Sequence, residues 1–439
     1  MKTINGSDFP GFFDAPKAKE LAGQTVELCA CVHKVRQMSG FAFVVLRTGR
    51  YIVQSVYSPD SCPDSMEGIR EGCYVRVSGE VKPDERANHG FELLLSSIAL
   101  LSQPAAEYPL KVSARKLGCS LDVNLDNRSV ALRNPYERAV FKLQEGIVSG
   151  FREYMLQENF TEIHSPKIVA AGAEGGANIF HLDYFDRQAY LAQSPQFYKQ
   201  TAVAFFDRVF EIAPVYRAER HSTSRHLNEY IGLDFEMGFI QGMDDVMQVE
   251  TGMLRHVMAH LNAHYQGELK ILGVTLPEVG NIPSVTFVEA LDILRGEGSG
   301  RNRFDLDPAD EVRLCEYAKK EFDSEFIFVT HFPTAKRPFY AMDDPSDPRA
   351  ALSFDLLFRG LEITTGGQRI HDYNEQVAKM ERMGLNPAEF ESYLAIHKYG
   401  MPPHGGLGIG LERLLMKLLD LQNVRQASLF PRDMNRLEP

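Results

Sequence analysis

Apolar and polar residues alternate along five short stretches of the chain between residues 24 and 100. In the first stretch, Val26, Leu28, Ala30 and Val32 would share one face of a strand, because successive side chains of a strand point to opposite sides. The other four stretches begin near Phe41, Tyr51, Tyr74 and Phe91. Five short strands separated by turns predict a small Greek-key β-barrel.

The barrel fold of this size that most often binds nucleic acid is the OB-fold, which is therefore the predicted fold of this region. An aromatic ring on the face of such a barrel can stack on an unpaired base. Phe43 lies close to Arg36, Arg47 and Gln54 in the alternating pattern, and this combination would suit an unpaired RNA loop. The alternative is that Phe43 belongs to the core of the barrel.

Cys29, Cys31 and His33 alternate along the first predicted strand and would project from one face of it. Three such side chains could crowd around a metal ion, but the sequence offers no second ligand pair with the spacing of a closed zinc site. We therefore interpret the three residues as a plain strand face. The six cysteines are too sparse and irregular for a disulfide framework and are expected to be free thiols.

The alternating pattern fades between residues 103 and 135, which we interpret as a hinge. An apolar stripe at helical spacing then predicts a helix from Glu137 to Gln157, and an extended segment follows that ends at Pro166. The predicted organisation is a barrel over residues 1–102, a linker over 103–135 and a larger domain over 136–439.

A hairpin with an apolar back and a charged front is predicted between residues 208 and 238. The residues on its back are Phe210, Ile212, Tyr216, Leu233, Phe235 and Met237. The residues on its front are Glu211, Arg217, Glu219, Asp234 and Glu236. With Arg225 and His226 in the connecting loop, this front would suit a site for a triphosphate and an ammonium group. The alternative is that the charged front simply faces water.

Four glycines between Gly405 and Gly410 precede an amphipathic helix that is predicted from Leu411 onward. Glycines would clear side chains from the approach to the helix N-terminus, where free N–H groups favour an anionic group. Arg413, in the first turn, opposes the helix dipole and is therefore better explained by a ligand such as a nucleotide. The alternative is a tight connection followed by a solvated charge.

Composition places few limits on function. The chain has 439 residues, of which 44% are hydrophobic and 24% charged, so it can form two or three globular domains. Its net charge of −12 argues against indiscriminate binding of nucleic acid, but an RNA could still be held by a local basic face. With no apolar signal segment and no stretch near the roughly 20 apolar residues that span a bilayer, we expect a cytoplasmic protein without membrane association.

Three stretches resemble the signature motifs of the class II aminoacyl-tRNA synthetases. Gly408-Ile409-Gly410-Leu411-Glu412-Arg413 resembles the third motif, Gly-x-Gly-x-x-Arg. The charged hairpin, in which Tyr216-Arg217-Ala218-Glu219 precedes Arg225-His226 and Asp234-x-Glu236, resembles the second motif of the subclass that contains the aspartyl, asparaginyl and lysyl enzymes. The segment 137–166 resembles the first motif, which forms the dimer interface in that family.

Two further stretches resemble the aspartyl enzymes of the archaeal and eukaryotic type: residues 172–176 with 193–200, and residues 361–371. The interval between Glu236 and Asp355 is too short for the domain that the usual bacterial aspartyl enzymes insert. The resemblance runs from about residue 20 to Asp433. It implies an α+β multidomain protein with an OB-fold anticodon-binding barrel and a class II catalytic domain, which is an antiparallel sheet flanked by helices.

The resemblance also implies the roles of individual residues. Arg217, Glu362 and Arg413 would be catalytic, with Arg217 on the α-phosphate of ATP and Arg413 on the γ-phosphate. Glu362 and Thr365 would hold Mg²⁺, although the family commonly has serine at the second position. The residues implied to bind L-aspartate are Glu174, Gln193, Gln196, Lys199, Arg217, Asp234, Thr365 and Arg369. Those implied to bind ATP are Arg217, Ala218, Glu219, Arg225, His226, Leu227, Glu362, Gly410, Leu411, Glu412 and Arg413. Those implied to contact the tRNA anticodon are Cys31, Arg36, Phe43, Gln54 and Pro83.

The function implied is that of a homodimeric aspartate–tRNA ligase, which converts L-aspartate and ATP to aspartyl-adenylate and transfers the aspartyl group to tRNA-Asp. Lys199 and Arg369 would bind the side-chain carboxylate of the substrate. Two alternatives are an asparaginyl-tRNA synthetase and a synthetase-like paralogue that only binds its ligands. The presence of Arg217, Glu362 and Arg413 favours an active enzyme.

The first barrel strand bears on which tRNA is charged. Relatives restricted to tRNA-Asp tend to have Gly-Trp-Val where this chain reads Ala30-Cys31-Val32. A small thiol in place of a bulky ring would loosen the selection of the third anticodon base, so tRNA-Asn is expected as a second acceptor. The alternative is that a neighbouring loop, residues 81–84, restores the selection.

Overall fold

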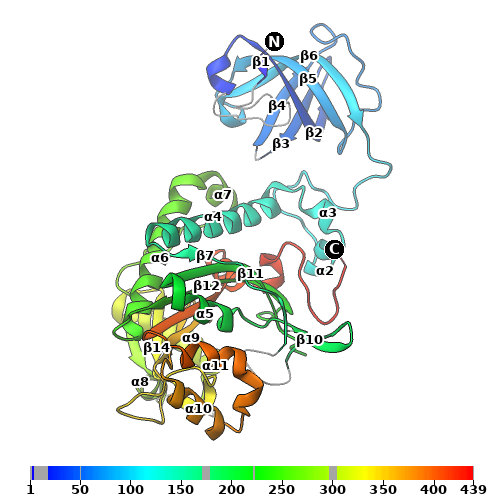
Figure 1. Ribbon diagram of the computed structural model, residues 1–439. Helices are drawn as coiled ribbons and strands as arrows, with labels where there is room; N and C mark the ends of the chain where they lie inside the picture. Colours follow the sequence, from blue (N-terminus) through cyan, green and yellow to red (C-terminus); the bar gives the residue numbers. More distant parts are fainter. Residues whose placement is uncertain are drawn as a thin grey trace. The chain divides into compact units, whose positions relative to one another are not determined.

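The computed structural model describes residues 2–3, 18–49, 51–170, 178–220, 223–295 and 304–438. They form two compact units, Met1–Arg138 and Ala139–Pro439, which Figure 1 draws in blue to cyan and in green to red. Within the described ranges, no helix combines the length and the apolar character that are needed to cross a bilayer.

The first unit contains a closed five-stranded barrel, as predicted. Its strands follow the order β2-β3-β4-β6-β5, and pairing of β5 with β2 closes the ring. The pairs are antiparallel except for β4 with β6. The strands are β2 (Thr25–Gln37), β3 (Ala42–Thr48), β4 (Tyr51–Tyr57), β5 (Tyr74–Pro83) and β6 (Phe91–Ser102), and a short β1 (Lys2–Thr3) pairs with β2.

The alternation seen in the sequence defines the barrel core. The four residues predicted to share one face of β2 all belong to it: Val26, Leu28, Ala30 and Val32. Phe43 of β3 lies outside this core, whereas Val44 and Leu46 of the same strand belong to it. The ring of Phe43 is half-buried and meets the ring of Phe41 edge to face, with 5.3 Å between the centroids.

Two expectations about the barrel need correction. Cys29, Cys31 and His33 do not continue one regular strand face, because the pairing of β2 with β3 shifts register between Val32 and Lys34. A bulge of this kind breaks the alternation on which the shared face depended. Residues 81–83 are not a loop but the end of β5, where Val81 packs in the barrel core.

The segment interpreted as a hinge contains two short helices, α2 (Leu121–Asp126) and α3 (Arg128–Ala131). The long helix α4 (Pro135–Gln157) follows and begins two residues before its predicted start. Asn134 caps it, because its Oδ1 accepts hydrogen bonds from the backbone N–H groups of Tyr136 at 2.9 Å and Glu137 at 3.3 Å. Proline suits the first position of a helix, because a backbone N–H group there would have no hydrogen-bond partner within the helix.

The second unit is built on an eight-stranded sheet in the order β13-β14-β15-β16-β17-β12-β11-β7. Its five central pairings are antiparallel, as predicted, whereas the edge pairs β13–β14 and β11–β7 are parallel. The strands are β7 (Thr161–Glu162), β11 (Arg208–Tyr216), β12 (Glu229–Gly238), β13 (Ser284–Thr286), β14 (Phe326–Thr330), β15 (Ser353–Phe358), β16 (Leu361–Arg369) and β17 (His404–Gly410). A separate small sheet contains β8 (Ile168–Val169), β9 (His181–Tyr184) and β10 (Arg187–Leu191).

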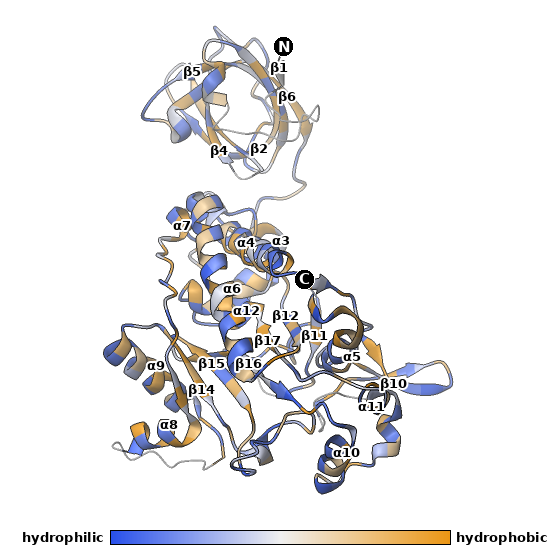
Figure 2. Ribbon diagram, turned by 60° about the vertical axis from the view of Figure 1, so that its left-hand side comes forward, coloured by the Kyte–Doolittle hydropathy of each residue, from blue (hydrophilic) through white to orange (hydrophobic). Residues whose placement is uncertain are grey.

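Helices surround the large sheet (Figures 1 and 2). They are α5 (Gln196–Phe206), α6 (Met243–His264), α7 (Gln266–Leu272), α8 (Phe287–Leu294), α9 (Pro308–Phe322), α10 (Tyr373–Arg382), α11 (Glu391–Lys398) and α12 (Leu411–Leu418). Short 3-10 turns are η1 (Lys19–Leu21), η2 (Asn88–Gly90), η4 (Thr334–Lys336), η5 (Pro387–Phe390) and η6 (Val424–Ala427).

The two faces of the large sheet have different roles. Its back face packs against α4, α6 and α12 in one continuous apolar core, to which Phe210, Phe235 and Leu407 contribute from three neighbouring strands. Since side chains alternate along a strand, the residues between these apolar positions point to the opposite side, the front face. The candidate site lies on the front face.

Candidate active site

The acids of the predicted hairpin lie on the front face but do not face water. Glu211, Asp234 and Glu236 are 2%, 6% and 0% exposed, and Asp234 pairs across the hairpin with Glu211. The interpretation of a solvated charged front is therefore wrong. Ionised carboxylates are buried at this depth only when cations or hydrogen-bond donors compensate them.

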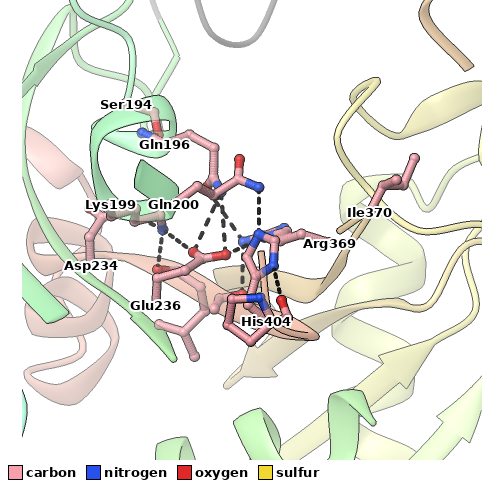
Figure 3. Close-up of polar contacts among 12 residues, drawn as sticks. Ser194, Gln196, Lys199, Gln200, Asp234, Glu236, Arg369, Ile370 and His404 are labelled. Carbon is pink, nitrogen blue, oxygen red and sulfur yellow. Dashed lines mark hydrogen bonds and ion pairs between the residues drawn. The ribbon is translucent and has the colours of Figure 1, made fainter. Parts of the chain in front are cut away.

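Two buried cations converge on Glu236 (Figure 3). Lys199 projects from α5, and its Nζ lies 3.0 Å from Asp234 Oδ1 and 3.4 Å from Glu236 Oε2. Arg369, at the end of β16, donates through Nε to Glu236 Oε1 at 2.8 Å. Each cation also donates to a backbone carbonyl of β17, Lys199 to Leu407 at 2.8 Å and Arg369 to Gly406 at 2.9 Å.

The two acids differ in how well they are compensated. Burial opposes ionisation of Glu236, but the charges of Arg369 and Lys199 outweigh it and lower the pKa of this carboxyl. Burial raises the pKa of Asp234, and the charge of Lys199, with a smaller contribution from Lys167, only partly offsets that effect. A further positive group beside Asp234 would complete its compensation, so this corner of the site suits an ammonium group.

The glycines of β17 make room for these acids. Gly406 lies opposite Glu236 and Gly408 opposite Asp234 in the pairing of β17 with β12. A Cβ atom at Gly408 would lie 2.9 Å from Asp234 Oδ1, and one at Gly406 would clash with the Glu236 carboxylate. From the sequence, these glycines were expected to clear the approach to a helix. The structure places them in a strand, where they give space to the acids.

A second set of buried polar groups supports the ion pairs from behind. His404 is fully buried, and burial lowers its pKa to about 4, so the ring is neutral. Its Nδ1 lies 2.9 Å from Pro402 O and must donate, so Nε2 accepts from Gln200 Nε2 at 2.8 Å. Gln196 contacts both Glu236 and Arg369 at 3.4 Å, which helps to hold the pair in one geometry.

Further cations lie toward the beginning of α12. Arg413 donates through Nη1 to the carbonyl of Glu362 at 3.1 Å and through Nε to the carbonyl of Arg225 at 3.4 Å. Arg225 itself is paired with Glu311 of α9 at 2.5 Å. Arg217 follows β11, where its backbone carbonyl accepts from Asn228 Nδ2 at 2.7 Å. Backbone contacts therefore fix the segments that carry three arginines expected to bind phosphates.

Acidic oxygens gather on the neighbouring part of the front face. Thr365 Oγ1 donates to Glu362 Oε1 at 3.0 Å, and Asp355, which pairs with Thr365 across β15 and β16, forms an ion pair with Arg337 at 2.9 Å. Burial raises the pKa of Asp355 to about 6, although Arg337 opposes the rise, and the charge of Glu362 adds to it. Asp355 Oδ1 is buried without a hydrogen-bond partner among the described residues. These hard oxygen donors fit a magnesium ion, which binds few carboxylates and retains several waters.

One cavity of about 690 Å³ connects the region around Lys199 and Arg369 with the region around Glu362 and Arg413. It brings together most residues predicted from the sequence: Gln193, Gln196, Lys199, Arg217, Glu219, Arg225, His226, Leu227, Asp234, Glu362, Thr365, Arg369, Gly410, Glu412 and Arg413. Ala218 and Leu411 are outside its lining. Glu174 falls outside the described residues.

Some predicted residues take part indirectly. Glu412 lines the cavity, but its Oε2 accepts from the Ile231 N–H at 3.0 Å, and burial raises its pKa to about 8. It therefore braces β12 against α12. His226 Nδ1 lies 2.6 Å from Thr223 Oγ1, and Gln193 Nε2 donates to Asn178 O at 3.1 Å.

Glu236 was expected on the charged front of the hairpin but was assigned no ligand, and no role was predicted for His404, Asp355, Glu311 or the lining segment 335–341. Glu236 had a detectable signal, since it lies two residues after Asp234 on the charged face of the same predicted strand. The other residues come from distant segments, and no local pattern marked them.

The five predicted anticodon residues lie on four strands of the barrel, β2, β3, β4 and β5. Cys31 is only 3% exposed, and its side chain is covered. Gln54 Nε2 donates to Glu92 Oε2 at 3.3 Å, whereas Arg36 and Phe43 are partly exposed and pair with each other across β2 and β3. Pro83 ends β5 and is exposed.

Comparison with known proteins identifies related chains. Residues 120–434 match the family model described as tRNA synthetases class II (D, K and N), and residues 26–101 match the OB-fold nucleic acid binding domain, which confirms the predicted OB-fold. The chain is 45% identical to an aspartate–tRNA(Asp/Asn) ligase of Deinococcus radiodurans over 95% of this chain and 96% of that protein. It is 38% identical to an aspartate–tRNA(Asp) ligase of Pyrococcus abyssi over 96% of this chain and 98% of that protein.

A solved structure is similar along nearly the whole chain. The asparaginyl-tRNA synthetase of Pyrococcus horikoshii, complexed with asparaginyl-adenylate, superposes with a TM-score of 0.88 at 32% identity. The match covers 96% of this chain and 98% of that one.

Proposed function

The chain belongs to the class II tRNA synthetases of the D, K and N group, and we propose on this premise that it is an aspartate–tRNA ligase. It activates L-aspartate with ATP to form aspartyl-adenylate and transfers the aspartyl group to tRNA. The observation that carries the choice of amino acid is the buried group Lys199–Glu236–Arg369 on the front face. The aspartate ligases that are similar to this chain support the same choice.

The amino acid binds at the inner end of the cavity. Its α-ammonium group takes the place beside Asp234, because the cations around this carboxyl compensate it only in part. Its side-chain carboxylate reaches Lys199 and Arg369, which line the same cavity. A neutral carboxamide in that place presents an NH₂ donor to two cations that also only donate, so asparagine is rejected by mismatched donors as well as by charge.

ATP occupies the outer end of the cavity. Arg217 contacts the α-phosphate, and Arg413 contacts the γ-phosphate with Arg225 and His226 nearby. Glu362 and the Thr365 hydroxyl would hold Mg²⁺, and Asp355, which pairs with Thr365 across β15 and β16, would offer a further oxygen. When bound, the ion neutralises part of the triphosphate charge.

Catalysis in such a site consists mainly of positioning and charge stabilisation. The aspartate α-carboxylate oxygen attacks the α-phosphorus, a new P–O bond forms, and pyrophosphate leaves with the electrons of the broken bond. Arg217 stabilises the negative charge that accumulates on the α-phosphate oxygens. In the second step, the terminal ribose hydroxyl of the tRNA attacks the carbonyl carbon of the adenylate, loses its proton and releases AMP.

Two further properties follow from family membership. We propose a homodimer whose interface includes α4 and β7, the elements that correspond to the first family motif, and sedimentation equilibrium can distinguish it from a monomer. We also propose a cytoplasmic location, which a role in translation supports and which fractionation of cells can test.

The amino-acid assignment is tested by pyrophosphate exchange into ATP. We expect exchange with L-aspartate and only background exchange with L-asparagine, because the asparagine carboxamide is neutral and its NH₂ group cannot accept a hydrogen bond from Lys199 or Arg369. L-glutamate, which keeps the charge but is one methylene longer, is the control for the length of the site. Exchange with asparagine equal to that with aspartate would refute the assignment.

We also propose that the enzyme charges tRNA-Asn as well as tRNA-Asp. The relative from Deinococcus radiodurans carries an Asp/Asn name, whereas the less similar one from Pyrococcus abyssi carries an Asp name. The two anticodons differ only at the third base. Cys31 is covered, so it acts through the small volume of its side chain and not by contacting the base.

Kinetic comparison of the two acceptors tests this proposal. Loss of one discriminating contact is worth about 1–3 kcal/mol, so kcat/KM for a tRNA-Asn transcript should lie within about 100-fold of that for tRNA-Asp. A tRNA-Lys transcript measures charging without anticodon recognition. A gap between tRNA-Asp and tRNA-Asn much larger than this would restrict the enzyme to tRNA-Asp.

A further inference from the structure

Helices α4 and α6 lie side by side against the back face of the large sheet (Figures 1 and 2). Their backbones approach closely where α4 carries Gly150. A Cβ atom at this position would lie 3.3 Å from Val257 Cα and 3.2 Å from His260 Cβ, both on α6. A larger residue would therefore push the helices apart. This close approach brings the next turn of α4 within reach of the side chains of α6.

Three potential metal ligands meet at this contact. Glu153 Oε2 of α4 lies 2.9 Å from Nδ1 of His260 and 3.4 Å from Nε2 of His256. One donor atom from each of the three residues lies within 4.8 Å of the other two. His256 and His260 are four residues apart on α6 and so share one face of the helix.

The hydrogen bonding within this group is incomplete. One carboxylate oxygen serves both rings, and His256 Nε2 is buried without a hydrogen bond to any described residue. A cation bound between the three donors would use the lone pairs of both rings and the carboxylate together. The two separations from Glu153 Oε2 already suit this, since two ligands bound tetrahedrally to zinc at about 2.0–2.1 Å lie roughly 3.3 Å apart.

We propose that Glu153, His256 and His260 form a binding site for a divalent transition metal of the zinc class. Two imidazole nitrogens and one carboxylate oxygen are a donor set that zinc accepts, with a water molecule as the fourth ligand. Magnesium is a poor fit because it prefers oxygen donors. The site is separate from the proposed magnesium site, and none of its residues lines the catalytic cavity.

The role of this metal is structural. It ties α4 to α6, and α6 supports the catalytic sheet from behind through residues such as Met253 and Leu254 of the shared core. A ligand that binds only the folded chain raises its stability in proportion to the logarithm of the ligand concentration above Kd. Zinc should therefore raise the melting temperature without being required for aspartate activation.

The test uses the full-length protein in buffer containing millimolar Mg²⁺, with Co²⁺ as a spectroscopic probe and Zn²⁺ as its competitor. We expect one Co²⁺ per chain, with visible bands of tetrahedral nitrogen and oxygen coordination and no thiolate charge-transfer band. The absence of a thiolate charge-transfer band distinguishes binding at this site from binding by the free cysteines. Zn²⁺ should displace Co²⁺ and raise the melting temperature.

Variants assign the ligands. Glu153→Gln, His256→Gln and His260→Gln should each weaken binding by about 100-fold or more, since even the loss of a group outside the coordination sphere costs about 10- to 100-fold. His264→Gln is the matched control, because His264 lies on the same helix with its ring 4.8 Å from that of His260 but outside the group of three. Aspartate activation without added zinc should be normal in all four variants.

The absence of stoichiometric Co²⁺ binding would overturn the proposal. So would undiminished binding in the double variant His256→Gln, His260→Gln, or an equal loss of binding in His264→Gln. All of these substitutions lie at exposed or half-buried positions, and circular dichroism of each variant will verify its fold.

Discussion

Replacing Arg369 with leucine is expected to lower the rate of aspartate activation by about 10²- to 10⁴-fold while ATP binding is retained. The Arg369 guanidinium is 5% exposed, donates to Glu236 at 2.8 Å and lines the inner end of the cavity. Without it, the substrate carboxylate loses one of its two cations inside a buried site, at a cost of about 3–5 kcal/mol, which corresponds to this range of rates. Single-turnover formation of the adenylate measures the effect directly.

The controls separate loss of function from loss of fold. Removing one partner of a buried ion pair also destabilises the protein, so melting curves and ATP binding must accompany the rate. Arg369→Lys keeps the charge but not the planar set of N–H donors, and it should lose less activity than the leucine variant. Arg359→Leu removes an arginine of the turn between β15 and β16 that pairs with Glu325 at 2.5 Å, away from the cavity, and this variant should activate aspartate normally. Normal activity in a folded Arg369→Leu variant would remove Arg369 from the site.

The features that the sequence predicted well are those with a local cause. Alternation along residues 26–32 depends only on the pleat of a strand, and it led to the correct barrel core. Apolar spacing likewise placed α4 and α12 within two residues of their observed starts, Pro135 and Leu411. The back of the hairpin was predicted for the same reason, and Phe210 and Phe235 are both in the core.

The physical role of the glycines could not be predicted, because it depends on pairing between distant strands. Nothing near Gly406 in the chain indicates that it will lie opposite Glu236. The same limit applies to the compensation of Glu236, whose two cations come from segments before and after it in sequence, on α5 and β16. A buried acid can be suspected from its place on a strand, but its partners are set by tertiary structure. The chemical roles given to the individual cavity residues remain predictions.

The sequence also gave no indication of the contact between Arg225 and Glu311. Arg225 was expected near the triphosphate, and it does line the cavity, but in the structure an acid of α9 holds it at 2.5 Å. Burial raises the pKa of Glu311, and the charge of Arg225 only partly offsets this. A triphosphate would therefore compete with Glu311 for Arg225. An arginine held in place by an acid is oriented before its ligand arrives, which reduces the entropy lost on binding.

Replacing Glu362 with glutamine is expected to slow adenylate formation by about 10³-fold or more at millimolar Mg²⁺, since metal ions contribute several kcal/mol of charge stabilisation to such reactions. Glu362 Oε1 accepts from the Thr365 hydroxyl at 3.0 Å, and its backbone N–H donates to Glu311 at 2.9 Å, so both the side chain and the backbone of this residue are held. Glutamine preserves the size of the side chain and can still accept from Thr365, but it lacks the charge that binds the ion. The loss should therefore appear in the rate and in its dependence on Mg²⁺, with little change in stability.

Two further variants distinguish loss of a metal ligand from a general disturbance of the sheet. Thr365→Ser retains the hydroxyl and should remain close to normal, because only the oxygen takes part in the site. Glu325→Gln removes a carboxylate that pairs with Arg359 outside the cavity, and it should leave the Mg²⁺ dependence unchanged. Raising Mg²⁺ should partly restore Glu362→Gln, because Asp355 and the Thr365 hydroxyl still offer oxygen donors on the same face. If the variant activates aspartate at the normal rate and with the normal Mg²⁺ dependence, the ion is held elsewhere and the charge of Glu362 has no part in catalysis.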